Sequence, residues 1–276
     1  MSADGSAMPA SETLKDIQST LGSVPDFLKL FPEEALPGAW ETMKNLELSG
    51  TTAVPPKYKE LIGLGVAAQI PCKYCVYFHT EAAKLNGATD REIREAVAEA
   101  SMTRFWSTVL NGVGQDPAAF REEIERGLAH LQSMGDKQPP QIEITDAQSA
   151  FQDMEANFGF VPTFMKALPV GVVAAAWREM KQFDMNPATA IPNKYKDLLS
   201  VGVASQIPCQ YCVYADKEFA KADGATEQEL NEAIGMAGIT RQWSTFLNGL
   251  DLNQTTFRKQ VDAVMQHAKG GMASAK

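Results

Sequence analysis

The chain has 276 residues, a hydrophobic content of 45% and a formal net charge of −9 at pH 7. This composition is ample for a buried core and predicts a globular protein of one large or two ordinary domains. The negative charge argues against nucleic acid and anionic membranes as partners, and no apolar run approaches the roughly 20 residues of a membrane helix.

The N-terminal segment from Met1 to Ser11 is small and polar, without a basic stretch followed by an apolar one. No secretory signal is therefore predicted, and we expect a cytoplasmic location. All four cysteines fall into two CxxC pairs, Cys72 with Cys75 and Cys209 with Cys212. In a chain without a secretion signal, such pairs indicate redox or metal chemistry rather than structural disulfides.

The chain repeats itself at a constant offset of 137 residues, which relates both CxxC pairs, Trp40 to Trp177, and Trp106 to Trp243. A constant offset predicts two copies of one backbone course without insertions. We assign the repeats to residues 11–135 and 146–270. Between them, a glycine and two consecutive prolines break any helix.

Within each repeat the periodicity of apolar residues is helical, and no stretch alternates for long enough to indicate a strand. Thr89 followed by Glu92 predicts a capping box at the start of a long helix. Pro56 suits a first helical turn, and Gly63 is expected to pack closely against a neighbouring helix. The fold is therefore predicted to be all-α, a tandem duplication whose first repeat has helices at about 14–21, 26–31, 33–48, 56–70, 72–85, 90–112 and 117–132.

A run of the form Arg-x-Trp-Ser-Thr-x-Leu-Asn-Gly occurs at Arg104–Gly112 and again at Arg241–Gly249. Its simplest interpretation is packing in the core and at a helix end. A role in lining a site is the alternative.

Cys72, Cys75 and His79 are spaced for one stripe of a helix. Cys72 belongs to the first turn, where unpaired N–H groups and the helix dipole favour a thiolate. Glu60 lies ten residues before the turn at Ile70-Pro71, and His79 lies nine residues after it. On antiparallel helices rising about 1.5 Å per residue, the two side chains should meet. A carboxylate there would orient the imidazole and raise its basicity.

Zinc is the main chemical alternative, because Cys72, Cys75, His79 and Glu60 are residue types that bind it tetrahedrally. However, three of these four share one helix, whereas a structural zinc site usually draws ligands from separated segments. We therefore expect neither a metal nor a cofactor. His79 or Glu60 alone would more simply be a packed histidine or a surface charge, and the combination favours function.

The spacing of Glu60, Cys72, Cys75 and His79 resembles the core motif of alkyl hydroperoxidase D-like (AhpD-like) proteins, within the carboxymuconolactone decarboxylase superfamily. The resemblance covers nearly the whole chain and implies a thiol-dependent peroxidase or a disulfide oxidoreductase. By motif position, Cys75 would attack the peroxide and Cys72 would resolve its sulfenic acid. Glu60 and His79 would form the proton relay. The decarboxylase branch lacks the CxxC pair, which disfavours lactone decarboxylation.

The resemblance also implies partners: a small-molecule peroxide, and a dithiol reductant or peroxiredoxin-type protein. The ring-like assemblies of the family suggest a homo-oligomer, with a trimer as our expectation and a dimer as the alternative. The non-enzymatic alternative is a redox sensor or scaffold whose dithiols only report oxidation.

The second repeat departs from the motif, since Cys209 and Cys212 remain but Asp197 and Asp216 occupy the relay positions. An aspartate is a weak base near neutral pH, and two neighbouring carboxylates tend to share one proton. We therefore expect this second, degenerate site to activate its thiol poorly while still forming a disulfide.

Overall fold

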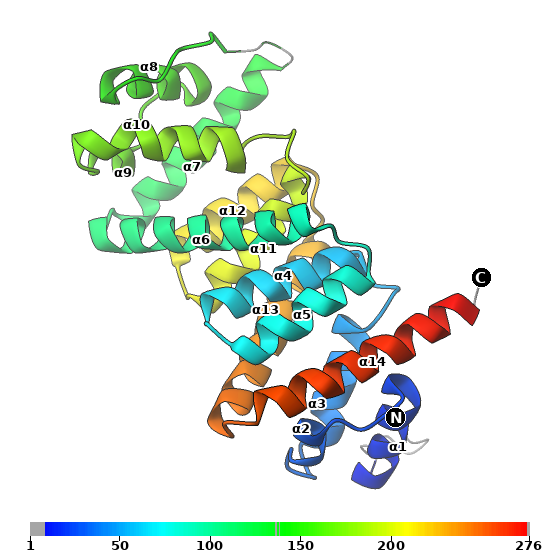
Figure 1. Ribbon diagram of the computed structural model, residues 1–276. Coiled ribbons are helices and arrows are strands. Elements are labelled where there is room, and N and C mark those ends of the chain that lie inside the picture. Colours follow the sequence, from blue (N-terminus) through cyan, green and yellow to red (C-terminus); the bar gives the residue numbers. More distant parts are fainter. Residues whose placement is uncertain (1–8, 136, 138, 275–276) are drawn as a thin grey trace. The chain divides into compact units, whose positions relative to one another are not determined.

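The computed structural model describes residues 9–135, 137 and 139–274, and within these ranges it is helical without a β-strand (Figure 1). The first repeat contains α1 (Ala10–Leu21), α2 (Asp26–Lys29), α3 (Leu36–Thr42), the π-helix η1 (Met43–Glu47), α4 (Pro56–Gln69), α5 (Lys73–Leu85), α6 (Asp90–Val113) and α7 (Pro117–Met134). The second contains α8 (Ala147–Phe158), α9 (Thr163–Lys166), α10 (Val170–Glu179), η2 (Met180–Asp184), α11 (Asn193–Gln206), α12 (Gln210–Ala222), α13 (Glu227–Gly249) and α14 (Gln254–Ser274). The predicted all-α fold is confirmed.

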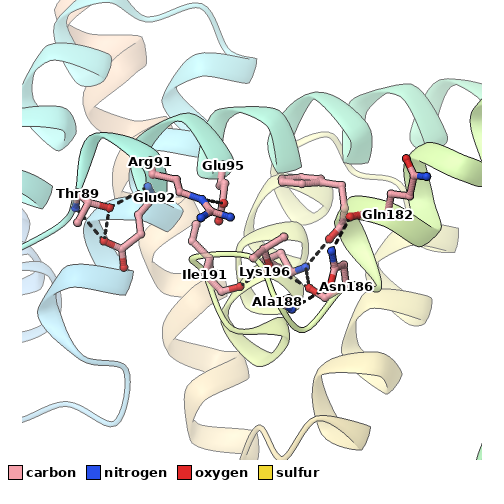
Figure 2. Close-up of polar contacts among 11 residues, drawn as sticks. Thr89, Arg91, Glu92, Glu95, Gln182, Asn186, Ala188, Ile191 and Lys196 are labelled. Atoms are coloured by element: carbon pink, nitrogen blue, oxygen red, sulfur yellow. Dashed lines mark hydrogen bonds and ion pairs between the residues drawn. The ribbon is translucent and has the colours of Figure 1, made fainter.

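The helix ends follow the predicted signals. Gly22 ends α1 in a left-handed conformation that a residue without Cβ adopts freely. Thr89 and Glu92 form the predicted capping box, each side chain bonding the other residue's backbone N–H, as Figure 2 shows.

The segment predicted as one helix over 33–48 is different. It begins only at Leu36 and changes into a π-helix at Met43. Hydrophobic periodicity does not reveal such a change of hydrogen-bond register, because a single wide turn alters the spacing of very few side chains.

Structural details repeat with the sequence. In the first copy, the indole N–H of Trp40 and the ammonium of Lys44 both donate to the carboxylate of Asp16. In the second copy, Trp177 and Lys181 donate in the same way to Asp153. The constant offset of 137 residues therefore corresponds to a repeated tertiary arrangement.

Packing divides the chain into two compact units that differ from the two sequence repeats. Unit 1 comprises residues 1–97 with 231–276, and unit 2 comprises residues 98–230. Unit 1 thus contains the first CxxC helix together with most of α13 and all of α14, which belong to the second repeat. The assignments 11–135 and 146–270 describe the duplication, and each compact unit draws on both copies.

Tyrosines on the CxxC helices contact the borrowed segments. In unit 1, Tyr74 donates to the carbonyl of Leu252 and Tyr77 to Asp262, and α14 lies along α5 (Figure 1). In unit 2, Tyr211 and Tyr214 of α12 make the matching bonds to the Gln115 carbonyl and to Glu125. These contacts hold each CxxC helix against the last helix of the opposite repeat.

Among the described residues, no helix has both the length and the apolar character required to cross a membrane.

A candidate dithiol site and its altered copy

The two cysteines of unit 1 lie at the start of α5. Cys72 is the N-cap residue, and its sulfur accepts a hydrogen bond from the backbone N–H of Cys75 at 3.2 Å. The two residues form a disulfide, with Cα atoms 5.4 Å apart. Both are almost completely buried. The helix start therefore holds a vicinal cysteine pair, and its N-cap sulfur accepts from a backbone N–H of the first turn.

Glu60 and His79 meet, as counting along the two helices predicted. Oε2 of Glu60, on α4, lies 2.8 Å from Nδ1 of His79, on α5. Gly63 makes this approach possible, because a Cβ there would lie 2.4 Å from the imidazole ring. The close packing expected of Gly63 is thus confirmed, and the atom it accommodates belongs to His79.

Glu47 is a third member of this cluster. Its Oε1 lies 3.6 Å from His79 Nδ1, and its other oxygen has no hydrogen-bond partner although it is buried. Glu47 ends the π-helix η1. The buried ammonium of Lys59 donates to the carbonyls of Leu46 and Ser49 on either side of it. π-helical turns are frequent at functional sites, and here one delivers a carboxylate to the imidazole.

The opposite repeat completes the site through Thr240 of α13, whose hydroxyl lies 3.2 Å from Nε2 of His79. A small cavity of about 30 Å³ is lined by Cys75, His79 and Glu47, and by Thr240, Trp243 and Leu247 from α13, among others. The last three belong to the repeated Arg-x-Trp run or directly precede it. The Trp and Leu side chains of this run pack in the core, as the simpler interpretation predicted, and they also line the cavity, as the alternative predicted.

Burial governs protonation in this cluster. It raises the pKa of Glu60 to about 8 and that of Glu47 to about 7, the latter also through repulsion from Glu60. Burial lowers the pKa of His79. Each shift favours the uncharged form, so near neutral pH a proton between Glu60 and His79 is held without a full charge on either group. Such a pair can exchange a proton at little electrostatic cost.

One group of three residues could hold a metal ion among the described part of the chain. It consists of Glu47, Glu60 and His79, whose ligand atoms lie within 4.8 Å of one another. This set differs from the Cys72, Cys75, His79 and Glu60 set considered for zinc, since the two sulfurs are bonded to each other. A cation here would have to replace the hydrogen bond between Glu60 and His79.

The corresponding dithiol of unit 2 is reduced, with Cys209 and Cys212 both free and buried. Cys209 is the N-cap of α12, and its sulfur accepts from the Cys212 N–H and from Nδ2 of Asn111. Hydrogen bonds, first from Cys212, lower the pKa of Cys209 to about 6 despite burial. The hydrogen bond to Cys209, burial and the charge of Asp216 raise the pKa of Cys212.

This pattern modifies the expectation for the degenerate site. The raised pKa of Cys212, the equivalent of Cys75, disfavours its thiolate, and poor activation of this thiol stays a prediction. Its partner Cys209 is activated without any histidine, because the donors come from the helix start and from α6.

Asp197 and Asp216 both lie in the altered site and line a common cavity in unit 2. Burial is the first cause that raises the pKa of each, and repulsion from Asp184 adds to the effect on both. Ser200 stands at the position of Gly63. Its hydroxyl accepts from Thr103 and donates to Glu99. Ser200 thus bonds to Thr103, the equivalent of Thr240, whose hydroxyl contacts the imidazole in unit 1.

Glu47 and Thr240 were not predicted from the sequence as members of this cluster. Both had a usable signal, because the offset of 137 pairs Glu47 with Asp184 and Thr240 with Thr103. Acidic residues at equivalent positions of the two repeats are common, and Glu47 is distant from the CxxC segment along the chain. Its role becomes visible only in the structure, where the π-helix places it beside His79.

The Carboxymuconolactone decarboxylase family matches the chain twice, at residues 34–115 and 172–253. No curated protein matches it significantly. One solved structure that is similar comes from Burkholderia xenovorans LB400 and is provisionally described as a gamma-carboxymuconolactone decarboxylase subunit. It has 15% sequence identity and a TM-score of 0.52, covers 95% of this chain and is itself covered completely, a likeness that concerns the fold alone. Because the family match extends over more than half of the chain and recurs in both repeats, the protein belongs to the carboxymuconolactone decarboxylase family.

Proposed function

We propose that the protein is a thiol-dependent peroxidase of the alkyl hydroperoxidase D type, with its activity in unit 1. The Cys75 thiolate attacks the O–O bond of a hydroperoxide, giving a sulfenic acid and, after one proton transfer, an alcohol or water. The Cys72 thiol then condenses with the sulfenic acid, releasing water and forming the disulfide. An external dithiol reduces this disulfide and is itself oxidised to a disulfide.

The contact between Glu60 and His79 at 2.8 Å, beside a cavity that Cys75 lines, carries this proposal. His79 takes the thiol proton and returns it to the leaving oxygen, while Glu60 holds the other ring nitrogen. Thr240 fixes the ring from its Nε2 side.

The roles of the two sulfurs follow from access and helix position. Cys75 lines the cavity, whereas Cys72 is fully buried at the N-cap. A reductant entering by the cavity attacks Cys75 and expels Cys72 as a thiolate, which the helix start stabilises. This assignment agrees with the free dithiol of unit 2, where the N-cap sulfur of Cys209 has the lower pKa.

The expected partners are a small hydroperoxide and a dithiol or peroxiredoxin-type protein, and homo-oligomerisation stays part of the proposal. Exposed apolar side chains within unit 2, including Phe105 and Val170, suit a subunit contact. Sedimentation analysis of the full chain would distinguish a trimer from a dimer.

The test uses the full-length protein with cumene hydroperoxide and dithiothreitol. We expect many peroxide molecules to be consumed per chain, dependent on both reagents. Oxidation of one dithiol per chain without turnover would overturn the proposal in favour of a redox sensor.

His79→Asn tests the relay separately. A general base contributes about 10²–10⁴-fold, so the peroxide rate at pH 7 should fall within this range. The pH at which reduced Cys75 reacts with iodoacetamide should also rise. Asp216→Asn, the same position in unit 2, is the matched control and should change neither quantity. An unchanged pH profile in His79→Asn would remove the imidazole from the mechanism.

A further inference from the structure

We propose that unit 2 contains a binding site for an apolar molecule that carries a protonated amine. The site is the cavity beside Cys212, separate from the small peroxide cavity of unit 1. It goes beyond the peroxidase proposal and does not depend on it.

The cavity has a volume of about 290 Å³. For comparison, an apolar cavity of about 150 Å³ suffices for benzene, so a body of roughly two rings fits. Six aromatic side chains contribute to the walls, from Trp106, Phe120, Phe158, Phe160, Phe164 and Phe219. The faces of such rings attract cations as well as apolar groups.

Six carboxyl groups line the same cavity: Glu99, Glu123, Asp184, Asp197, Asp216 and Asp223. Three of them, Glu99 Oε2, Asp197 Oδ2 and Asp216 Oδ2, present a buried oxygen that accepts no hydrogen bond from a non-acidic donor. Glu99 with Asp184, and Asp197 with Asp223, form carboxyl–carboxyl contacts that can share a proton. Glu99 is 2% exposed, so water does not satisfy its free oxygen at the surface. Unpaired buried acceptors are costly to leave without a donor, and an ammonium group supplies three.

The equivalent positions of unit 1 carry fewer acidic residues. Met236 corresponds to Glu99, His79 to Asp216, and Asn86 to Asp223. Glu47 and Glu60, already acidic, correspond to Asp184 and Asp197. Gln260 corresponds to Glu123, so four of the six positions are acidic in unit 2 alone. Lys196, whose charge acts on several of these acids, has its counterpart in Lys59, so this positive charge is the same in both units.

Space changed together with charge. Phe78, His79 and Leu85 of unit 1 are replaced by the shorter side chains of Ala215, Asp216 and Ala222, and Ala82 by the aromatic Phe219. All four replacements line the cavity. The result is a larger hollow with an additional ring in its wall, which is what an apolar cation requires.

The buried ammonium of Lys196 is already engaged elsewhere. It donates to the carbonyls of Phe183, Asp184 and Asn186 and so holds the turn after η2, part of which Figure 2 shows. A compact metal ion fits less well, since the described residues of unit 2 provide no three ligand atoms within 4.8 Å of one another. An extended organic cation can instead reach acids that are spread along the cavity.

Burial and repulsion between neighbouring carboxylates raise the pKa of these acids. Burial is the first cause at Asp197 and at Asp216, and repulsion from Asp184 follows. A bound ammonium would reverse this effect and make the acids release protons.

Isothermal titration at pH 7 with 2-phenylethylamine, 2-phenylethanol and 3-phenylpropionate tests the proposal on the full chain. The three share a body and differ in the head group. We expect the amine to bind at least about tenfold more tightly than the alcohol, a difference of about 1.4 kcal/mol, and the carboxylate not to bind. Titration in buffers of different ionisation enthalpy should show proton release for the amine alone.

Asp216→Asn and Asp197→Asn should each weaken the amine about tenfold while leaving the alcohol unchanged. Glu218→Gln removes the same charge from α12 outside the cavity and serves as the control. Ala215→Phe, which restores the unit 1 residue, should abolish binding of both. Equal affinity for amine and alcohol would overturn the proposal. So would an amine affinity that these variants leave unaltered, or no binding to folded wild type.

Discussion

The two CxxC sites of this chain start their helices in the same way and differ in what surrounds the second cysteine. In unit 1 a buried imidazole is held between Glu60 and Thr240. In unit 2 an aspartate replaces the imidazole, and the equivalent threonine bonds to Ser200. The cavity beside the second cysteine has a volume of about 30 Å³ in unit 1 and about 290 Å³ in unit 2.

This difference separates two contributions to thiol chemistry. The N-cap sulfur is stabilised by a backbone N–H in both units, because that donor belongs to the helix start and does not depend on the side chains that changed. The base beside the other sulfur depends on His79 alone. The two copies therefore share the N-cap sulfur and differ in the imidazole and in the size of the cavity beside the second sulfur.

Replacing Cys75 or Cys212 by serine, one at a time, should give the largest difference in peroxide turnover between the two units. Cys75→Ser should reduce peroxide turnover by at least about 10³-fold, since a hydroxyl cannot replace a thiolate nucleophile. Cys212→Ser should retain most of the activity. Peroxide consumption at saturating dithiothreitol measures both.

Loss of turnover in Cys212→Ser with retention in Cys75→Ser would mean that the active site lies in unit 2. Equal partial losses would mean that both dithiols turn over, and the Asp216 site would then need another base.

Much of unit 1 could be predicted from the sequence because the relevant residues are close along two consecutive helices. Counting residues on either side of Pro71 was enough to place Glu60 against His79, and helical spacing placed Cys72, Cys75 and His79 together. The duplication was visible because its offset never changes.

Other features depended on tertiary structure. Thr240 lies 161 residues from His79 and reaches it only because α13 joins the opposite repeat. Glu47 depends on the π-helical turn, which no pattern of apolar residues encodes. The cavity of unit 2 arises from several replacements that look conservative or isolated one at a time.

Gly63→Ala should disturb the position of the His79 ring in unit 1. The added Cβ would lie 2.4 Å from the His79 ring, so the ring must move away from Glu60. Overpacking of this kind costs about 1–3 kcal/mol of stability, and peroxide turnover should fall about tenfold or more. Urea denaturation and the pH profile of turnover are the measurements.

Ser200→Ala is the matched change in unit 2. It removes hydrogen bonds to Glu99 and from Thr103, which costs about 1 kcal/mol, and should leave turnover unaltered. A Gly63→Ala protein with normal activity and an unshifted pH profile would show that the contact with Glu60 is dispensable.

The smallest effect concerns stability and pH in unit 2. Burial raises the pKa of Asp216 above its unfolded value of about 3.9, so the folded chain keeps a proton that the unfolded chain releases. The resulting stability is complete below the unfolded pKa and is lost as the pH rises through the folded pKa. Asp216→Asn removes this dependence. Relative to wild type, its free energy of unfolding should therefore increase between pH 5 and pH 8, by about 1–3 kcal/mol for an unpaired buried charge. Urea denaturation at both pH values, with Glu218→Gln as the control on the same helix, measures the difference. A difference that does not change with pH would mean that Asp216 ionises in the folded protein as it does in the unfolded chain.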